Sequence, residues 1–200
     1  MTPPDYSAWL TPERLAVEEV AWTDPARATW PVFVDFIKAR RGAMSMFSVI
    51  EFGCGTGLVA AGLPDTVTYH GEDANAECVL RARARNDGRP RRTFAIADVR
   101  AAWQYVAGKY ELACAFSFLK HFGLHEWDTI VERVLRPGRM GLFSVPVSLA
   151  GDRDEGLEFP HVWVTATRVE RAVRRAGHEV RSWDALPWGE TMVTTRLLLP

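Results

Sequence analysis

Cysteine is scarce in this chain, and the few cysteines present are not grouped. The 200 residues include three, Cys54, Cys78 and Cys114, and no two of them stand in a C-x-x-C spacing. This pattern argues against a zinc site and against a disulfide framework. We therefore expect no bound metal and a reducing, cytoplasmic location.

Long apolar runs are also missing. No basic segment followed by an apolar stretch opens the sequence, and nowhere do about 18 uncharged apolar residues follow one another. The sequence predicts a soluble, unexported protein that does not engage a membrane.

Neither sign of charge is in excess, because 24 Lys and Arg residues stand against 25 Asp and Glu residues, for a net charge of -1. A general attraction to nucleic acid is therefore not expected. Basic residues gather in one place, which we interpret as a solvated helix face, although a nucleic-acid substrate would need such a patch. They are Arg81, Arg83, Arg85, Arg89, Arg91 and Arg92.

What the sequence does contain is an alternation of short β-prone runs with helical segments. Strands are predicted over 46–52, 67–72, 93–97, 110–116 and 140–145, and helices over 58–63, 76–84, near 100–106, and over 126–134. Strands that alternate with helices indicate right-handed crossovers and a parallel sheet with helices on both faces.

The two ends of the chain depart from this alternation. A helix capped by Thr165 is predicted over 166–176, followed by strands at 179–183 and 192–198 that form a hairpin. At the N-terminus, one helix is predicted over 12–21, and a second begins either near Asp24 or at Pro31.

These elements predict an α/β fold with a doubly wound, mostly parallel seven-stranded sheet and an antiparallel C-terminal hairpin. The length suits one domain over 1–200, with N-terminal helices at 1–45 as a possible substrate lid and a Rossmann-like core at 46–200. Aromatic lid candidates are Tyr6, Trp9, Trp22 and Trp30.

Three predicted strand ends bear residues suited to a nucleotide-type ligand, which open parallel sheets bind at the carboxyl ends of their strands. The first strand runs into the glycine turn E-F-G-C-G-T-G at 51–57, where a ligand can approach the backbone closely. Asp73 ends the second strand, about 20 residues past the turn, at the spacing of a ribose-binding carboxylate. Asp98 ends the third strand, where it can accept a hydrogen bond from an exocyclic amine such as that of adenine.

Together these motifs resemble those of the class I S-adenosylmethionine-dependent methyltransferases. The glycine turn at 51–57 looks like the first motif of that family, Y-H-G-E-D at 69–73 like the second and A-D-V at 97–99 like the third. L-R-P-G-R at 135–139 resembles the turn before the fifth strand of the family, with Arg139 in place of the usual second glycine. The resemblance covers about residues 46–199.

The resemblance implies S-adenosylmethionine as the cofactor and assigns residues to it. The glycines of the turn would approach its methionine and ribose portions, Asp73 its ribose hydroxyls, Asp98 and Val99 its adenine, and Phe116 its methionyl end. Glu51 would orient the turn, or would cap backbone N–H groups in a purely structural role. The complete set is Glu51, Gly53, Cys54, Gly55, Gly57, Asp73, Ala74, Asp98, Val99 and Phe116.

The substrate side is less defined. His121 follows the fourth strand and is the leading candidate for a general base, although relatives often have a structural histidine there. His161 and Trp163 occupy a segment that commonly faces substrate, and packing is the safer interpretation of both. The chain lacks the N-P-P-Y, D-P-P-Y and Pro-Cys motifs of nucleic-acid base methylation, which favours a small-molecule acceptor.

Two alternatives remain open. NAD binding would need G-x-G-x-x-G, whereas the third glycine here comes one residue too early. A methyltransferase-like scaffold without turnover is the other, because no obvious general base is present and Arg139 departs from the family pattern. The sequence favours an S-adenosylmethionine-dependent methyltransferase; its acceptor and its oligomeric state do not follow from these residues.

Overall fold

The computed structural model describes residues 28–100, 105–154 and 162–198, together with 11, 13, 15, 20, 23 and 24. Contacts within the chain gather into two compact units. The first comprises residues 1–48 and 53–98, and the second residues 49–52 and 99–200. Most of the predicted helix at 12–21 and of the helical stretch at 100–106 lies outside the described residues, although Glu13, Leu15 and Val20 are described and helical. The one-domain division at residue 45 stays a prediction.

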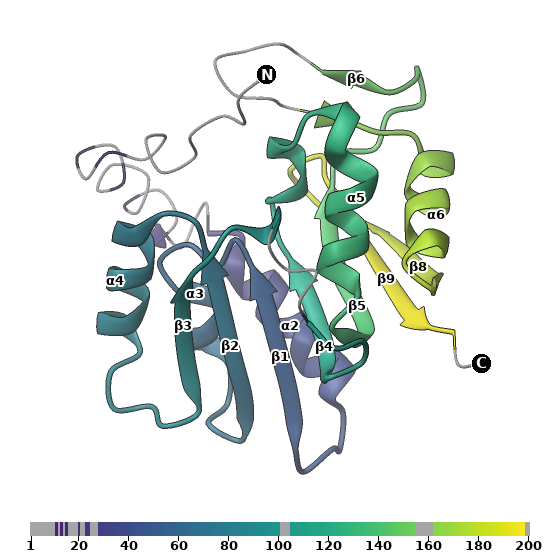
Figure 1. Ribbon diagram of the computed structural model, residues 1–200. Coiled ribbons are helices and arrows are strands. Elements are labelled where there is room, and N and C mark those ends of the chain that lie inside the picture. The colour runs from purple at the N-terminus through teal and green to yellow at the C-terminus, as the bar shows by residue number, and fades with distance from the viewer. Residues whose placement is uncertain are drawn as a thin grey trace. The chain divides into compact units, whose positions relative to one another are not determined.

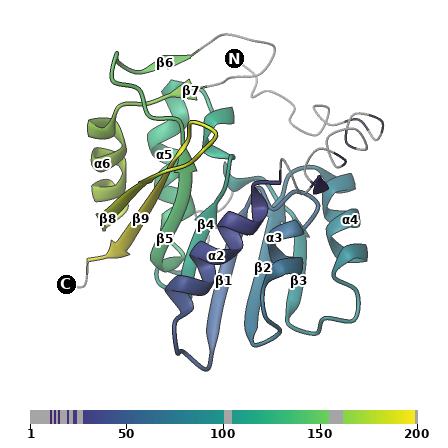
Figure 2. The same ribbon diagram turned by 180° about the vertical axis from the view of Figure 1, so that it is seen from behind.

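The first unit is built around a parallel pair of strands, β2 (Val67–Asp73) and β3 (Arg92–Ile96), in register from Tyr69 opposite Arg92 to Asp73 opposite Ile96. Its helices are α2 (Trp30–Arg41), α3 (Leu58–Gly62) and α4 (Ala76–Arg85). Figure 1 shows α4 beside β3, and Figure 2, from behind, shows α2 beside α3.

Helix α2 begins at Trp30, with Pro31 in its first turn. Proline is tolerated there because the first N–H groups of a helix have no partner within it. The predicted start near Pro31 is therefore confirmed, and the start near Asp24 is wrong. Trp30 packs against α3, since a Cβ placed on Gly62 would lie 2.7 Å from its ring. Of the lid candidates, Tyr6, Trp9 and Trp22 lie outside the described residues.

The second unit holds the rest of the strands and two long helices. Its parallel strands are β1 (Phe47–Phe52), β4 (Tyr110–Ala115) and β5 (Gly138–Val145), and its hairpin is β8 (His178–Ala185) with β9 (Thr191–Leu197). Helices α5 (Leu124–Leu135) and α6 (Ala166–Arg175) pack on each other (Figure 1). Their apolar faces and the strands enclose a core that includes Trp127, Ile130 and Phe143.

The strand order is β3-β2-β1-β4-β5-β9-β8, and β9 runs antiparallel to both of its neighbours. This confirms the predicted seven-stranded, mostly parallel sheet with a C-terminal hairpin. Two short elements were not predicted: the 3₁₀ helix η3 (Leu119–His121) and a two-stranded hairpin of β6 (Arg153–Asp154) and β7 (Val162–Trp163). No helix among the described residues is both long and apolar enough to cross a membrane.

Candidate functional site

The glycine turn of the first unit is tied to the end of β2 by its backbone. The N–H groups of Gly53 and Cys54 both donate to the carbonyl of Glu72, at 2.8 and 3.0 Å. The turn closes where the Gly57 N–H donates to the Cys54 carbonyl, and α3 begins directly after it. The predicted sequence of strand, glycine turn and helix is therefore present.

Two glycines of this turn serve different purposes. Gly55 has a φ of +52°, and a Cβ built on it would meet no described atom within 4 Å, so space lies open beside the backbone there. Gly57 has a φ of +73°, and its Cβ would lie 2.9 Å from both Ala82 and Asn86 on α4. Gly57 is thus required for packing of the turn on α4, whereas Gly55 leaves room for a ligand.

Asp73 links this turn to the start of α4. Its Oδ2 accepts the Gly55 N–H at 3.0 Å, and its Oδ1 accepts the Asn75 N–H at 2.8 Å. Burial raises the pKa of Asp73 above its ordinary value, against the opposing effect of the two N–H donors. An ionised carboxylate has about four acceptor positions, so two remain for the hydroxyls of a ribose. The residues present therefore fit the ribose of S-adenosylmethionine.

Asp98 lies at the same end of the strand pair. The N–H of Ala97 donates to the backbone carbonyl of Asp73 at 3.0 Å, which aligns the end of β3 with the end of β2. Asp98 follows and is exposed, and Ala74 is half-buried beside Asp73. The structure thus brings Gly55, Asp73 and Asp98 to one end of the first unit, as the sequence predicted.

The arginine cluster of the first unit acts mainly on backbone carbonyls. The guanidinium of Arg92 is buried and donates to Ala60, Leu63, Pro64 and Val67. Arg83, Arg85 and Arg89 donate to Phe94, Thr56 and Ala61 respectively. The interpretation as a solvated helix face is therefore wrong for Arg85, Arg89 and Arg92, which fix the glycine turn and the end of α3. Arg83 is exposed on α4 and bonds to β3.

The remaining cofactor candidates belong to the second unit. Glu51 is buried in β1, opposite Cys114 of β4. Val99 is 4 % exposed and its side chain lies in the core, so any contact with adenine would involve its backbone. Phe116 directly follows β4 and is also buried. Their roles toward the cofactor stay predictions.

His121, the predicted catalytic residue, ends η3 and is half-buried. Its role as a base stays a prediction. Trp163 lies in β7, where the guanidinium of Arg153 stacks 4.7 Å from its ring centroid, which favours packing, and His161 lies outside the described residues.

Sequence reasoning missed a group of polar side chains close to η3. The ammonium of Lys120 lies 2.8 Å from Oε1 of Glu190, and the hydroxyl of Ser117 donates to Oε2 at 3.1 Å. Burial alone would raise the pKa of Glu190, but Lys120 and the hydroxyls of Ser144 and Ser117 hold it below its usual range. No local signal identifies this group, because Lys120 and Glu190 are 70 residues apart.

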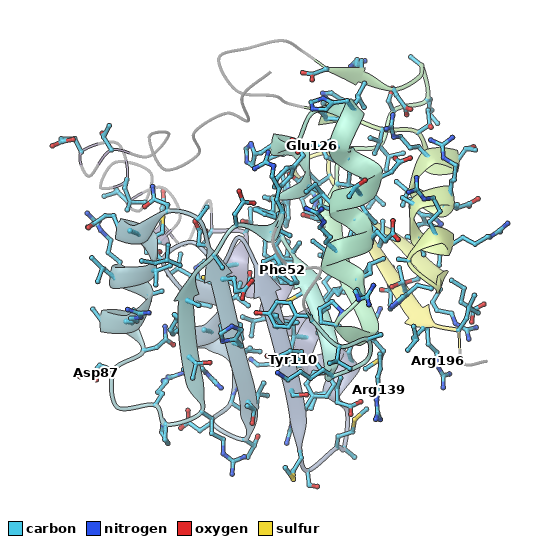
Figure 3. All side chains as sticks on the ribbon, in the orientation of Figure 1. Phe52, Asp87, Tyr110, Glu126, Arg139 and Arg196 are labelled. Atoms are coloured by element: carbon cyan, nitrogen blue, oxygen red, sulfur yellow. The ribbon has the colours of Figure 1, made fainter. Side chains whose placement is uncertain are left out.

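Arg139, the departure from the family pattern, lies away from these residues. It is the second residue of β5, its side chain is 65 % exposed, and it pairs with Glu111 at 3.4 Å. Figure 3 shows Arg139 and Tyr110 at one end of the second unit and Glu126 at the other. Because β4 begins at Tyr110, Arg139 lies at the amino ends of the strands and gives no reason to expect a lost activity.

Comparison with known proteins agrees with this geometry. Residues 49–138 match the family model described as a methyltransferase domain. No curated protein matches the chain.

Several solved structures share the fold. Magnesium protoporphyrin IX methyltransferase from Synechocystis PCC 6803, with bound S-adenosylhomocysteine, is 14% identical with a TM-score of 0.75, covering 96% of this chain and 98% of that one. The 1,6-didemethyltoxoflavin-N1-methyltransferase of Burkholderia thailandensis is 16% identical with a TM-score of 0.70, covering 94% and 85%. The [4+2]-cyclase SpnF is 17% identical with a TM-score of 0.71, covering 90% and 87%.

The match lies on the part of the chain that contains the glycine turn, Asp73 and Asp98. Residues 49–138 thus match a methyltransferase domain, and the chain shares the fold of solved class I S-adenosylmethionine-dependent methyltransferases.

Proposed function

We propose that this methyltransferase transfers the methyl group of S-adenosylmethionine to a small-molecule acceptor. The observation that carries the proposal is the carboxylate of Asp73, which is fixed by the N–H groups of Gly55 and Asn75 and keeps acceptor positions for a ribose. Two proteins of similar fold, named for magnesium protoporphyrin IX and 1,6-didemethyltoxoflavin, support a small acceptor.

In this proposal the first unit binds the cofactor. Gly53, Cys54, Gly55 and Gly57 contact its methionine and ribose portions, Asp73 and Ala74 its ribose hydroxyls, and Asp98 the adenine amine. Glu51, Val99 and Phe116 are the further cofactor residues that the resemblance to the family implies. The bound cofactor supplies an activated methyl group, and the protein contributes mainly the alignment of the acceptor with it. His121 is the candidate base for an acceptor that must lose a proton.

A scaffold without turnover remains the second candidate, because the chain has no obvious general base. A similar fold also occurs in a protein named as a cyclase, so the fold alone does not imply methyl transfer. Methyl transfer distinguishes the two. The protein is incubated with S-adenosylmethionine labelled in its methyl group and with a panel of small phenols, carboxylic acids and amines. Label in an acceptor together with an equal amount of S-adenosylhomocysteine supports the methyltransferase. Cofactor binding without transfer to any acceptor of the panel supports the scaffold.

The working location we propose is the cytoplasm. The three cysteines are buried and no disulfide joins them, which suits a reducing compartment.

A further inference from the structure

The turn between α4 and β3 contains a pair of residues that the cofactor assignments do not use. Asp87 and Gly88 are both exposed, just beyond the end of α4 (Figure 3), and no other aspartate in the sequence is followed by glycine. Such a pair suits a tight turn, because the aspartate side chain bonds to nearby backbone and glycine adopts a positive φ without strain. Gly88 has a φ of +74°.

The backbone nitrogen of Gly88 lies against the carboxyl group of Asp87. Its N–H donates to Oδ1 of Asp87 at 3.0 Å, and it bonds to no backbone carbonyl of the described residues. The N–H groups on either side are held by the backbone, since that of Asp87 donates to Ala84 at 3.4 Å and that of Arg89 to Asn86 at 3.2 Å. Within this turn, the nitrogen of Gly88 is therefore the one that backbone pairing does not hold.

The surroundings of Gly88 leave this nitrogen accessible. A Cβ built on Gly88 would meet no described atom within 4 Å, and glycine itself has no side chain to cover the nitrogen. Both residues of the pair face water. An amide nitrogen that is held beside a carboxyl group, in a turn that is free to change shape, is the arrangement from which a succinimide ring forms.

We propose that Asp87 is a site of spontaneous covalent modification, at which the Asp87–Gly88 pair closes to a succinimide and reopens as isoaspartate. The nitrogen of Gly88 forms a bond to Cγ of Asp87 in its protonated form. The bond from Cγ to the hydroxyl oxygen breaks, and the hydroxyl leaves together with the amide proton as one molecule of water.

Water then opens the ring at one of its two carbonyl carbons. Attack at Cγ restores aspartate. Attack at the main-chain carbon of Asp87 leaves that carbon as a free carboxylate, and the chain now continues through the side chain as isoaspartate. One water is lost and one is gained, so that no other reactant is needed and nothing is oxidised or reduced.

The ends of this turn are held in place, so the modification should strain it. Nδ2 of Asn86 donates to the carbonyls of Gly57 at 3.2 Å and Ala82 at 2.9 Å, and the guanidinium of Arg89 donates to that of Ala61 at 2.7 Å. Isoaspartate adds one carbon to the main chain between these two anchored residues. We expect the hydrogen bond from the Arg89 N–H to the Asn86 carbonyl to be lost and the modified protein to be less stable.

The test measures isoaspartate in the full chain after storage at neutral pH. Trypsin does not cut before proline, so it releases residues 86–91 as one peptide in which Asp87 is the only aspartate. The aspartate and isoaspartate forms of this peptide have equal mass, but chromatography separates them and electron-transfer fragments identify them. Asp65 is the matched control in the same sample, because its side chain is 78% exposed and threonine follows it.

We expect isoaspartate to accumulate at Asp87 and not at Asp65. Gly88→Ala should slow the reaction severalfold, because the methyl group shields the nitrogen and restricts the turn. Asp87→Glu should abolish it, because the longer side chain would have to close a larger ring. No more isoaspartate at Asp87 than at Asp65, or equal accumulation in Gly88→Ala and the wild type, would overturn the inference.

Urea unfolding of fresh and stored protein tests the effect on stability. The urea midpoint of the wild type should fall on storage, whereas that of Asp87→Glu should not, because other slow damage affects both proteins alike. Equal falls in the two proteins would overturn the claim that the anchored turn is strained by the added carbon. Neither measurement involves S-adenosylmethionine, so the inference stands or fails separately from the proposed function.

Discussion

Oδ2 of Asp73 accepts the backbone N–H of Gly55 across 3.0 Å, so that the end of β2 and the glycine turn are joined by a carboxylate. The second oxygen of the same carboxylate holds the Asn75 N–H at the start of α4. One side chain thus fixes two loops and still offers acceptor positions for a ribose. The same two carboxylate oxygens therefore hold the loops in place and bind the ligand.

Replacement of Gly57 by alanine should destabilise the protein more than a positive φ alone explains. The left-handed conformation costs about 1–2 kcal/mol for a non-glycine residue. The new Cβ would also lie 2.9 Å from Ala82 and Asn86, which adds about 1–3 kcal/mol of overpacking. Urea unfolding measures the sum.

Gly88→Ala is the matched control, because Gly88 has a φ of +74° and its Cβ would meet no described atom within 4 Å. It should show the conformational cost only. Equal losses of unfolding free energy in Gly57→Ala and Gly88→Ala would mean that α4 does not restrict the glycine turn.

Replacement of Arg92 by lysine should lower the free energy of unfolding by about 2 kcal/mol. The planar guanidinium reaches four carbonyls around the end of α3, and an ammonium on a flexible stem cannot satisfy all of them. The exposed Arg91 provides the control, because its side chain makes one hydrogen bond to the described residues, with the Thr66 carbonyl at 3.4 Å. Arg91→Lys should change stability by less than about 0.5 kcal/mol. Chemical denaturation measures the free energy of unfolding of both variants. Similar losses of this free energy in Arg92→Lys and Arg91→Lys would refute a structural role for the buried arginine.

His178 should make the fold sensitive to acid. Burial lowers the pKa of this histidine from 6.5 to about 4, so the folded state resists its protonation. Its contribution is fully present above pH 6.5, and it is lost as the pH falls toward 4, because the unfolded chain binds the proton first. The loss can reach about 3 kcal/mol.

Urea midpoints at neutral and at acidic pH measure this effect. His178→Asn should narrow the difference between the two conditions, whereas the same change at the exposed His125 should not. If the pH dependence of His178→Asn equals that of the wild type, the acid sensitivity belongs to other groups.

The sequence predicted the parts of the site that depend on the succession of strands, turns and helices along the chain. The glycine turn and Asp98 each follow a strand directly or within two residues, and Asp73 ends one, so alternation and spacing located them. The hairpin was found for the same reason, since two β-prone runs flank a turn-rich segment.

Features that depend on distant contacts were missed or misread. The carbonyls that Arg92 reaches lie 25 to 32 residues away, so its sequence neighbours suggested a solvated arginine. Lys120 and Glu190 meet only because the register of β5 and β9 brings the start of β9 to the carboxyl end of β5. Neither residue forms a motif with its neighbours in the chain.

The central claim is that Asp73 and the glycine turn bind S-adenosylmethionine, and calorimetric titration of the wild type and Asp73→Asn tests it most directly. The amide loses the charge and turns an N–H donor toward one of two backbone donors, so binding should weaken by about 1.5–3 kcal/mol, or roughly 10- to 150-fold. Asp87→Asn is the control, at the far end of the first unit in Figure 3. The account predicts that the wild type binds S-adenosylmethionine saturably and does not bind NAD, and that Asp73→Asn weakens this binding whereas Asp87→Asn does not. Equal affinity of Asp73→Asn and the wild type for S-adenosylmethionine, or binding of NAD instead, would contradict it.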